Sequence, residues 1–95
     1  MKISLCLPYM KESITRQTIV DWCERIEAGP FHSLACGERI TGYTLEMRNV
    51  LAFAAAITER VRIVPSLYVL PMHNAVWAAK EIATLDLLSN GRVTV

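Results

Sequence analysis

The residues best suited to chemistry form two short polar pairs, each placed directly after an apolar segment of β-strand type. The first pair is Glu38 and Arg39, and the second is His73 and Asn74. Carboxylates and imidazoles can transfer protons, imidazole near neutral pH, and a guanidinium holds anions through charge-assisted hydrogen bonds. Two simpler interpretations stay open. Glu38 and Arg39 could form an ion pair within their loop, and His73 could be a solvated loop histidine, because the sequence shows no acid paired with it.

The elements that must position these residues are clearest in the last third of the chain. Residues 61–70 form a short apolar run, rich in β-branched and aromatic residues and closed by a proline, which predicts a strand buried on both faces. Residues 75–88 have helical periodicity, Gly91 can end that helix with a positive φ, and residues 92–95 begin another β-type segment. A strand, a helix and a strand in this order form a parallel pair with a right-handed crossover.

The earlier part of the chain shows the same alternation. The predicted elements are a strand over 2–7, a helix over 14–28 capped by Ser13 or Thr15, a strand over 31–36, a polar loop over 37–43 and a helix from its N-cap Thr44 to Glu59. The helix faces expected to pack carry Ile19, Trp22, Cys23 and Ile26 in the first helix, and Met47, Val50, Leu51, Ala54 and Thr58 in the second. The order is therefore β-α-β-α-β-α-β.

An open doubly wound sheet and a (β/α)8 barrel both accept this order. A dinucleotide-binding sheet would carry G-x-G-x-x-G directly after its first strand, and residues 8–12 read Pro-Tyr-Met-Lys-Glu instead. We therefore expect an α/β fold in which residues 1–95, at most one domain, form the first half of a (β/α)8 TIM barrel, with parallel strands and covering helices.

Chain direction then assigns the candidate residues to the two rims of such a barrel. Loops after the carboxyl ends of the strands form the functional rim, and the opposite, stabilising rim mainly supports the fold. The functional rim is predicted to carry Pro8, Glu38, Ser66 and His73, and the stabilising rim Asp86, Ser89, Gly91 and Arg92. We expect the carboxylate of Asp86 to bond Arg92 or the backbone of residues 89–91. Pro65 cannot donate a ladder bond and predicts a bulge beside Ser66.

Composition excludes several classes of function. Hydrophobic residues make up 53% of the chain, yet no apolar run approaches the roughly 20 residues of a membrane helix. Ten scattered Lys and Arg against nine Asp and Glu argue against nucleic-acid or acidic-membrane binding. The three cysteines, Cys6, Cys23 and Cys36, show no C-x-x-C spacing, so we expect no disulfide framework and no metal site. Reduced thiols and the absence of an export signal predict a cytoplasmic protein, with Cys6 and Cys36 as small core residues.

Five short motifs in the second half of the chain carry a resemblance to a known family. They are Thr58-Glu59-Arg60-Val61-Arg62, Leu70-Pro71, Ala79-Lys80-Glu81, Ala83-Thr84-Leu85-Asp86 and Leu88-Ser89-Asn90-Gly91-Arg92. As a set they resemble the luciferase-like monooxygenases, barrel enzymes that use a flavin or a deazaflavin, with weaker similarity over 31–39 and 50–56. The resemblance implies that the chain is the N-terminal portion of such an oxidoreductase.

This resemblance also implies a cofactor and a set of site residues. Reduced FMN, or alternatively the deazaflavin coenzyme F-420, would meet a small organic substrate and, for a monooxygenase, oxygen. Catalytic roles fall to Glu38, Arg39 and His73, and cofactor contacts to Pro8, Ser66, Leu67, Tyr68 and Asn74. In relatives a cis peptide backs the flavin ring at the position of Ser66-Leu67. Arg39 departs from the acid-His pattern of many relatives, and Asn74-Ala75 replaces a common His-Pro.

A second, non-catalytic function is also open. Four parallel strands that do not close into a barrel leave two unpaired edges, and such edges associate readily. The chain could then act only as a self-associating or partner-binding module, and for either function we expect a homo-oligomer or association through the sheet edges.

Overall fold

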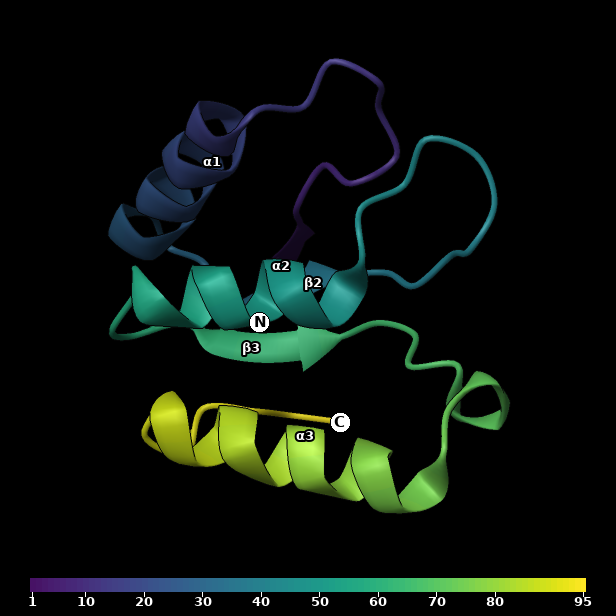
Figure 1. Cartoon of the computed structure of the whole chain (residues 1–95). Coiled ribbons are helices and arrows are strands. Elements are labelled where there is room, and N and C mark those ends of the chain that lie inside the picture. The colour runs from purple at the N-terminus through teal and green to yellow at the C-terminus, as the bar shows by residue number, and fades with distance from the viewer.

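Three parallel strands form one sheet at the centre of the computed structural model, which describes all 95 residues (Figure 1). The strands, in sheet order, are β1 (Ser4–Cys6), β2 (Ser33–Cys36) and β3 (Arg62–Pro65). The helices are α1 (Arg16–Ala28), α2 (Met47–Ala56), the short 3-10 helix η1 (Leu70–Met72) and α3 (Ala75–Leu88). The predicted alternation and parallel pairing are confirmed, and α3 has the predicted bounds.

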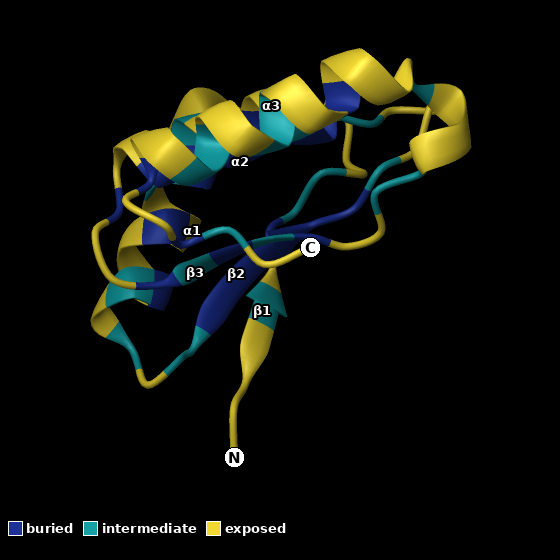
Figure 2. Cartoon of the chain, turned by 90° about the horizontal axis from the view of Figure 1, so that it is seen from below, coloured by how far each residue is buried: buried dark blue, intermediate teal, exposed yellow.

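The order of the strands and the placement of the helices identify the architecture. The sheet order β1-β2-β3 follows the chain, and the next segment continues it, because Val93 forms a parallel bridge with Ile63 of β3. In a doubly wound sheet of order 3-2-1-4-5-6 the fourth strand would return beside β1. Figure 2 shows α1, α2 and α3 on the same side of the sheet. Leu34 and Ile63, paired in register and both 0% exposed, face these helices and share one core with residues of α1 and α2. The chain is therefore folded as part of a barrel wall, with its helices on the outside.

The outer strands are shorter than predicted. β3 ends at Pro65, which has no N–H for the ladder, and the chain leaves the sheet after Ser66 N donates to Cys36 O. Residues 92–95 form an isolated parallel bridge between Ile63 and Val93 instead of a fourth strand. Burial of β3 on both faces was also a wrong prediction, because Arg62 is half-exposed on the sheet face that no helix covers.

Two further burial predictions are wrong, one on the uncovered sheet face and one beside the outermost strand. Cys6 is exposed, because it belongs to the outermost strand and is in register with Ala35 and not with the helix-facing Leu34. In α1, Ile19, Cys23 and Ile26 are buried as predicted, but Trp22 is 41% exposed. Its indole lines an open groove between α1 and β1.

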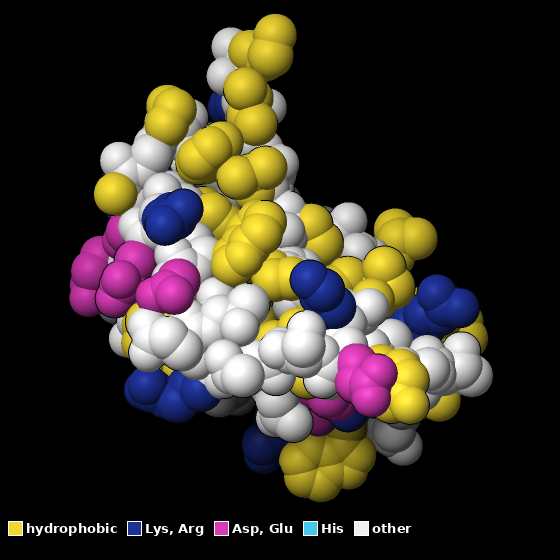
Figure 3. Space-filling view, turned by 90° about the horizontal axis from the view of Figure 1, so that it is seen from above, with side chains coloured by type: hydrophobic (Ala, Val, Ile, Leu, Met, Phe, Trp, Pro, Cys, Tyr) yellow, Lys and Arg dark blue, Asp and Glu magenta, His cyan; other side chains and the backbone are white.

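Exposed apolar side chains gather on the face that shows α1. Figure 3 shows them as a band across this face that continues toward the protruding N-terminal end of the chain. Lys and Arg side chains lie apart from one another on the same face and form no broad patch. None of the helices combines the length and the hydrophobicity required to cross a bilayer.

The helix N-termini show which capping predictions are correct. Thr15 caps α1, accepting from Thr18 N in a reciprocal capping box. Thr44 does not cap α2, because that helix starts later, at Met47. Glu46 takes this role and accepts from Asn49 N at 2.7 Å, whereas the hydroxyl of Thr44 donates to Arg39 O.

The stabilising rim is organised around the buried side chain of Arg92. Its five guanidinium N–H groups have five acceptors within 2.9 Å: the carbonyls of Ala55, Thr58, Val61 and Ser89, and the hydroxyl of Thr58. Ala55 and Thr58 lie at the C-terminus of α2, and Ser89 is the C-cap of α3. One cation thus satisfies the negative ends of two helices, where positive charge is favoured.

The predicted partner of Asp86 is therefore wrong. Asp86 Oδ1 accepts from Val93 N at 3.1 Å and makes no bond with Arg92, whose donors are already used by the carbonyls and the hydroxyl. Through this bond Asp86 joins α3 to the segment that pairs with β3.

Arg60 and Glu27 form a second junction on the same rim. The guanidinium of Arg60 donates to carbonyls at the C-terminus of α1, including those of Glu27 and Gly29. The carboxylate of Glu27 accepts from the backbone N–H groups of Glu59, Val61 and Arg60. Partial desolvation works against ionisation, but these donors outweigh it and lower the pKa of Glu27 below its ordinary 4.5.

Replacing Arg92 should destabilise the whole fold. We expect Arg92→Met to lower the free energy of unfolding by about 3 kcal/mol or more, since a buried acceptor left unpaired costs about 1–3 kcal/mol. Chemical denaturation followed by circular dichroism measures this loss. Lys80→Met removes a cation from an exposed helix position and should change stability by less than about 0.5 kcal/mol. Equal effects of the two variants would contradict the role assigned to Arg92.

Glu27 should make stability depend on pH in the acid range. Because its pKa is lower in the folded chain, the stabilisation is present above about pH 4.5 and is lost as the pH falls through the lowered pKa. Glu27→Gln should therefore be less stable than the wild type at pH 7 and lose less stability between pH 4.5 and 2. Glu24→Gln, on the exposed face of α1, should keep the wild-type slope in denaturation experiments across this range.

Candidate active site at the carboxyl ends of the strands

Glu38 and His73 meet on the functional rim, although 34 residues separate them in the chain. The distance from His73 Nε2 to Glu38 Oε2 is 2.6 Å, and the two side chains are only 11% and 8% exposed. Glu38 follows β2, and His73 follows β3 and η1. Because parallel neighbouring strands end at the same edge, their following loops lie side by side.

This pair corrects both simple interpretations of these residues. His73 has a paired acid and is mostly buried, so it is not a solvated loop histidine. Glu38 does not pair with Arg39, which is exposed and approaches Met10 Sδ at 3.9 Å. The sequence did contain a signal for this pair, because Glu38 and His73 each follow one of two adjacent parallel strands. Considering only partners within the same loop overlooks this relation.

The carboxylate fixes the imidazole and the backbone beside it. Glu38 Oε1 accepts from Val69 N at 2.8 Å, while Oε2 contacts His73. An ionised carboxylate only accepts hydrogen bonds, so Nε2 of His73 must be the donor. In the neutral ring this leaves Nδ1 as a free proton acceptor.

Tyr9 is a rim residue that the sequence reasoning missed. The chain approaches it so closely at Gly37 that a Cβ there would overlap Tyr9 Oη and lie 3.1 Å from Ser66 O. Loops after β1, β2 and β3 therefore touch at this point, next to the half-buried Pro8. The signal available in the sequence was the position of Tyr9, directly after Pro8.

The peptide bond between Ser66 and Leu67 is cis, as the resemblance implied. The chain turns here through this bond where a bulge was predicted. The side chain of Leu67 is 79% exposed. Together with four other exposed large apolar residues in the loops of the functional rim it forms an apolar border: Met10, Ile40, Leu67, Leu70 and Met72.

The remaining predicted site residues already have structural partners. Asn74 is the N-cap of α3, and its Oδ1 accepts from Val76 N and Trp77 N, which leaves the amide NH2 group for a ligand. Tyr68 directs its hydroxyl to Glu81 Oε2 at 3.2 Å, while its ring lies edge-on to the His73 ring.

The cysteines fit a packing role better than a catalytic one. Cys36 is fully buried, and burial raises the pKa of its thiol to about 12. A thiol that stays protonated at neutral pH is a poor nucleophile. No group of three or more His, Cys, Asp or Glu side chains could hold a metal ion.

An open cavity of about 360 Å³ lies beside the Glu38–His73 pair. Its walls combine two cations, Arg39 and Arg48, with apolar side chains such as Ile40 and Met72. Such a site could place an apolar ring against the rim, hold an anionic group by a guanidinium, and exchange a proton with His73 Nδ1.

Comparison with known proteins agrees with this architecture. The family model described as luciferase-like monooxygenase matches residues 1–95. The crystal structure of monooxygenase RslO1 from Streptomyces bottropensis superimposes with a TM-score of 0.89 at 28% identity, covering 100% of this chain and 32% of that one. The oxygenating constituent of 3,6-diketocamphane monooxygenase from Pseudomonas putida, a type II Baeyer-Villiger enzyme solved with FMN, gives a TM-score of 0.83 at 21% identity, covering 100% of this chain and 28% of that one.

A sequence relative adds a local match. The uncharacterized protein Rv0953c of Mycobacterium tuberculosis is 42% identical over 52 residues, which are 55% of this chain and 18% of the relative. The matched residues thus span about a third or less of each of these three proteins.

The Glu38–His73 contact should be visible in the tautomer of the imidazole. We expect 15N NMR of the neutral His73 ring to show a protonated Nε2 and an unprotonated Nδ1. Glu38→Ala removes the acceptor and should shift the ring toward a mixture of tautomers. Glu12→Ala, in an exposed loop, serves as the matched control and should leave the spectrum unchanged. A His73 spectrum that is the same in all three proteins would contradict the contact.

Proposed function

The chain belongs to the luciferase-like monooxygenase family, and we propose that it forms the N-terminal part of a barrel domain that acts as a flavin-dependent oxidoreductase or monooxygenase. The observation that carries this proposal is the mostly buried Glu38–His73 pair, which lines an open cavity on the functional rim. The substrate would be a small organic molecule, since the adjoining cavity is open and bordered by apolar side chains.

FMN is the cofactor that we propose, and the residues of the rim fit it. A fused apolar ring suits a wall made by the 66–67 peptide and Leu67, with Pro8 and Tyr68 as further contacts. The exposed guanidinium of Arg39 and the free amide of Asn74 supply polar contacts to its carbonyls or phosphate. The deazaflavin F-420 is the alternative, because it offers a similar ring.

The residues of this chain would bind, orient and exchange a proton. A reduced flavin, when bound, supplies the electrons for reaction with oxygen or for transfer to an acceptor. Glu38 keeps Nε2 of His73 protonated, so that Nδ1 can take a proton from substrate or cofactor and return it. The apolar border reduces the access of water to that exchange. The free cysteines suit a reducing compartment, and we propose the cytoplasm.

A non-catalytic module is the second candidate, and one observation favours it. Helix α3 exposes the apolar side chains of Val76, Trp77, Leu87 and Leu88, and the outer edge of β1 has no strand beside it. Self-association through these surfaces would make the chain an assembly unit. Analytical ultracentrifugation distinguishes a concentration-dependent oligomer from a monomer that binds flavin.

Flavin binding to the functional rim tests the proposal against a matched control. We expect FMN to bind the 95-residue chain, and Leu67→Asp to weaken that binding at least tenfold, because it places a charge against the ring. Leu87→Asp makes the same substitution at a residue of nearly equal exposure, 77% against 79%, at the opposite end of the molecule. That variant should bind as the wild type does.

Titration followed by flavin fluorescence gives the dissociation constants. Binding of F-420 but not of FMN would select the alternative cofactor. Absence of binding by either cofactor would refute the flavin-dependent function, and equal weakening by the two Asp variants would refute the site.

A further inference from the structure

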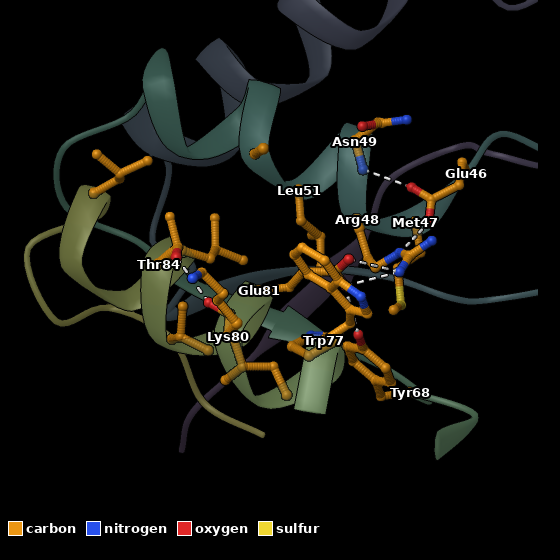
Figure 4. A pocket seen from close by; sticks show the side chains of 16 residues that line it. Glu46, Met47, Arg48, Asn49, Leu51, Tyr68, Trp77, Lys80, Glu81 and Thr84 are labelled. Atoms are coloured by element: carbon orange, nitrogen blue, oxygen red, sulfur yellow. Dashed lines mark hydrogen bonds and ion pairs between the residues drawn. The ribbon is translucent and has the colours of Figure 1, made fainter. Parts of the chain in front are cut away.

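Tyr68 connects the candidate active site to a second, charged cluster in the groove between α2 and α3. Figure 4 shows this groove, with Tyr68, Arg48 and Glu81 joined by hydrogen bonds and Trp77 among the residues that line it. Tyr68 and Glu81 lie outside the cavity of the proposed proton exchange, whereas Arg48 and its partner Glu46 line both the groove and that cavity. None of the members of the cluster except Tyr68 was a candidate from the sequence.

Three elements contribute to the cluster. Arg48, in the first turn of α2, donates from Nη1 to both carboxylate oxygens of Glu81 on α3, at 2.9 and 2.7 Å. Its Nε donates to Glu46, the N-cap of α2, at 2.5 Å. Tyr68 Oη donates to Glu81 Oε2 at 3.2 Å from the segment that follows β3. Glu81 therefore receives donors from a helix and from the loop of the site at the same time.

The aromatic ring of Tyr68 also contacts the imidazole ring of His73. The ring centroids of Tyr68 and His73 are 4.9 Å apart with an interplanar angle of 66°, an edge-to-face contact. Glu38 holds the same loop from the side of β2, through Val69 N and His73 Nε2. The segment from Tyr68 to His73 is thus held on two sides by carboxylates from different elements.

The charges of the cluster support a fixed geometry. Hydrogen bonds from Arg48, opposed by modest desolvation and helped by Tyr68, lower the pKa of Glu81 and keep it ionised. An ionised Glu81 can accept from Arg48 and Tyr68 together, whereas a protonated carboxyl would lose acceptor capacity. Because Arg48 and Glu81 are about one-third exposed, their attraction alone is screened, and the directional hydrogen bonds from Nη1 to the two carboxylate oxygens matter more than the charge.

We propose that Arg48, Glu81 and Tyr68 act as a positioning relay that fixes the His73 ring against Glu38, so that the groove between α2 and α3 controls the geometry of the candidate active site. The effect of this relay on catalysis rests on the proposed function, whereas the positioning of the His73 ring does not. Arg48 and Glu81 are positioning residues here, since they act through Tyr68 and His73, and the Tyr68 hydroxyl has the same role beside the flavin contact proposed for its ring. A change that releases Glu81 should let the Tyr68 ring move and loosen the imidazole, without removing any group that exchanges protons.

Two single substitutions break the relay at different bonds. Tyr68→Phe removes only the hydroxyl and keeps the ring beside His73, and Glu81→Gln keeps an acceptor for Tyr68 but cannot bind Arg48 through two carboxylate oxygens. Tyr43→Phe is the matched control, because Tyr43 is 69% exposed in the loop before α2. Stability measurements accompany each variant, so that loss of fold is distinguished from loss of positioning.

The readout is the NMR signal of the His73 ring without any cofactor. We expect both relay variants to shift and broaden the His73 ring signals while the circular dichroism spectrum and the ring signals of His32 stay as in the wild type. Tyr43→Phe should leave His73 unchanged. Unchanged His73 signals in both relay variants would overturn the proposal, as would a change that appears only together with unfolding.

Flavin affinity supplies an independent arm. Each relay variant should weaken FMN binding about threefold or more, the range expected for coupling through a contact network, and the double variant should lose little beyond the larger single effect. Additive losses would overturn the relay. If the wild-type chain binds no flavin, the proposed function fails, and the cofactor-free spectra still decide whether the relay positions His73.

Discussion

The guanidinium of Arg92 is the interaction on which the packing of this chain most depends. It is buried without a carboxylate, an arrangement that would be very costly if any of its donors lacked a partner. All five donors are used, four of the five acceptors are backbone carbonyls, and most of these lie at the C-terminal ends of α2 and α3. The charge is therefore balanced by helix ends, and the same contacts fix both helices relative to β3.

The two ends of the sheet consequently have different tasks. On the stabilising rim, Arg92, Arg60 and Glu27 bind backbone groups that helix ends and loop starts leave unpaired. On the functional rim, polar side chains bind one another, as Glu38 and His73 do, and apolar side chains such as Leu67 face solvent. One rim thus satisfies backbone groups at helix ends, whereas the other presents side chains that bind one another or face solvent.

The sequence determines the order of elements better than their contacts. Helical periodicity gave the bounds of α3 correctly, and chain direction alone assigned Arg92 to the rim where it lies. Two contacts could not be predicted: the pairing of Glu38 with His73, and the hydrogen bond from Val93 N to the carboxylate of Asp86. Both depend on how separate segments of the chain meet in space. Local patterns do not encode such contacts.

Burial was predicted least well around β1, the outermost strand of the sheet. Trp22 and Cys6 have the residue types of a core, and the structure exposes both, since one lines an open groove and the other faces away from the helices. Residue type reports the preference of a side chain, whereas its exposure depends on which neighbours are present.

The strand order β1-β2-β3 has a consequence for synthesis. Each strand hydrogen-bonds the one made just before it, so a growing chain never has to hold an unpaired strand until a remote partner is translated. Paired residues lie 29 positions apart in both strand pairs, Ser4 with Ser33 (33 − 4) and Ser33 with Arg62 (62 − 33), so each closure spans one βα unit and none spans the whole chain. The chain is thus suited to fold unit by unit, from its N-terminus, while it leaves the ribosome.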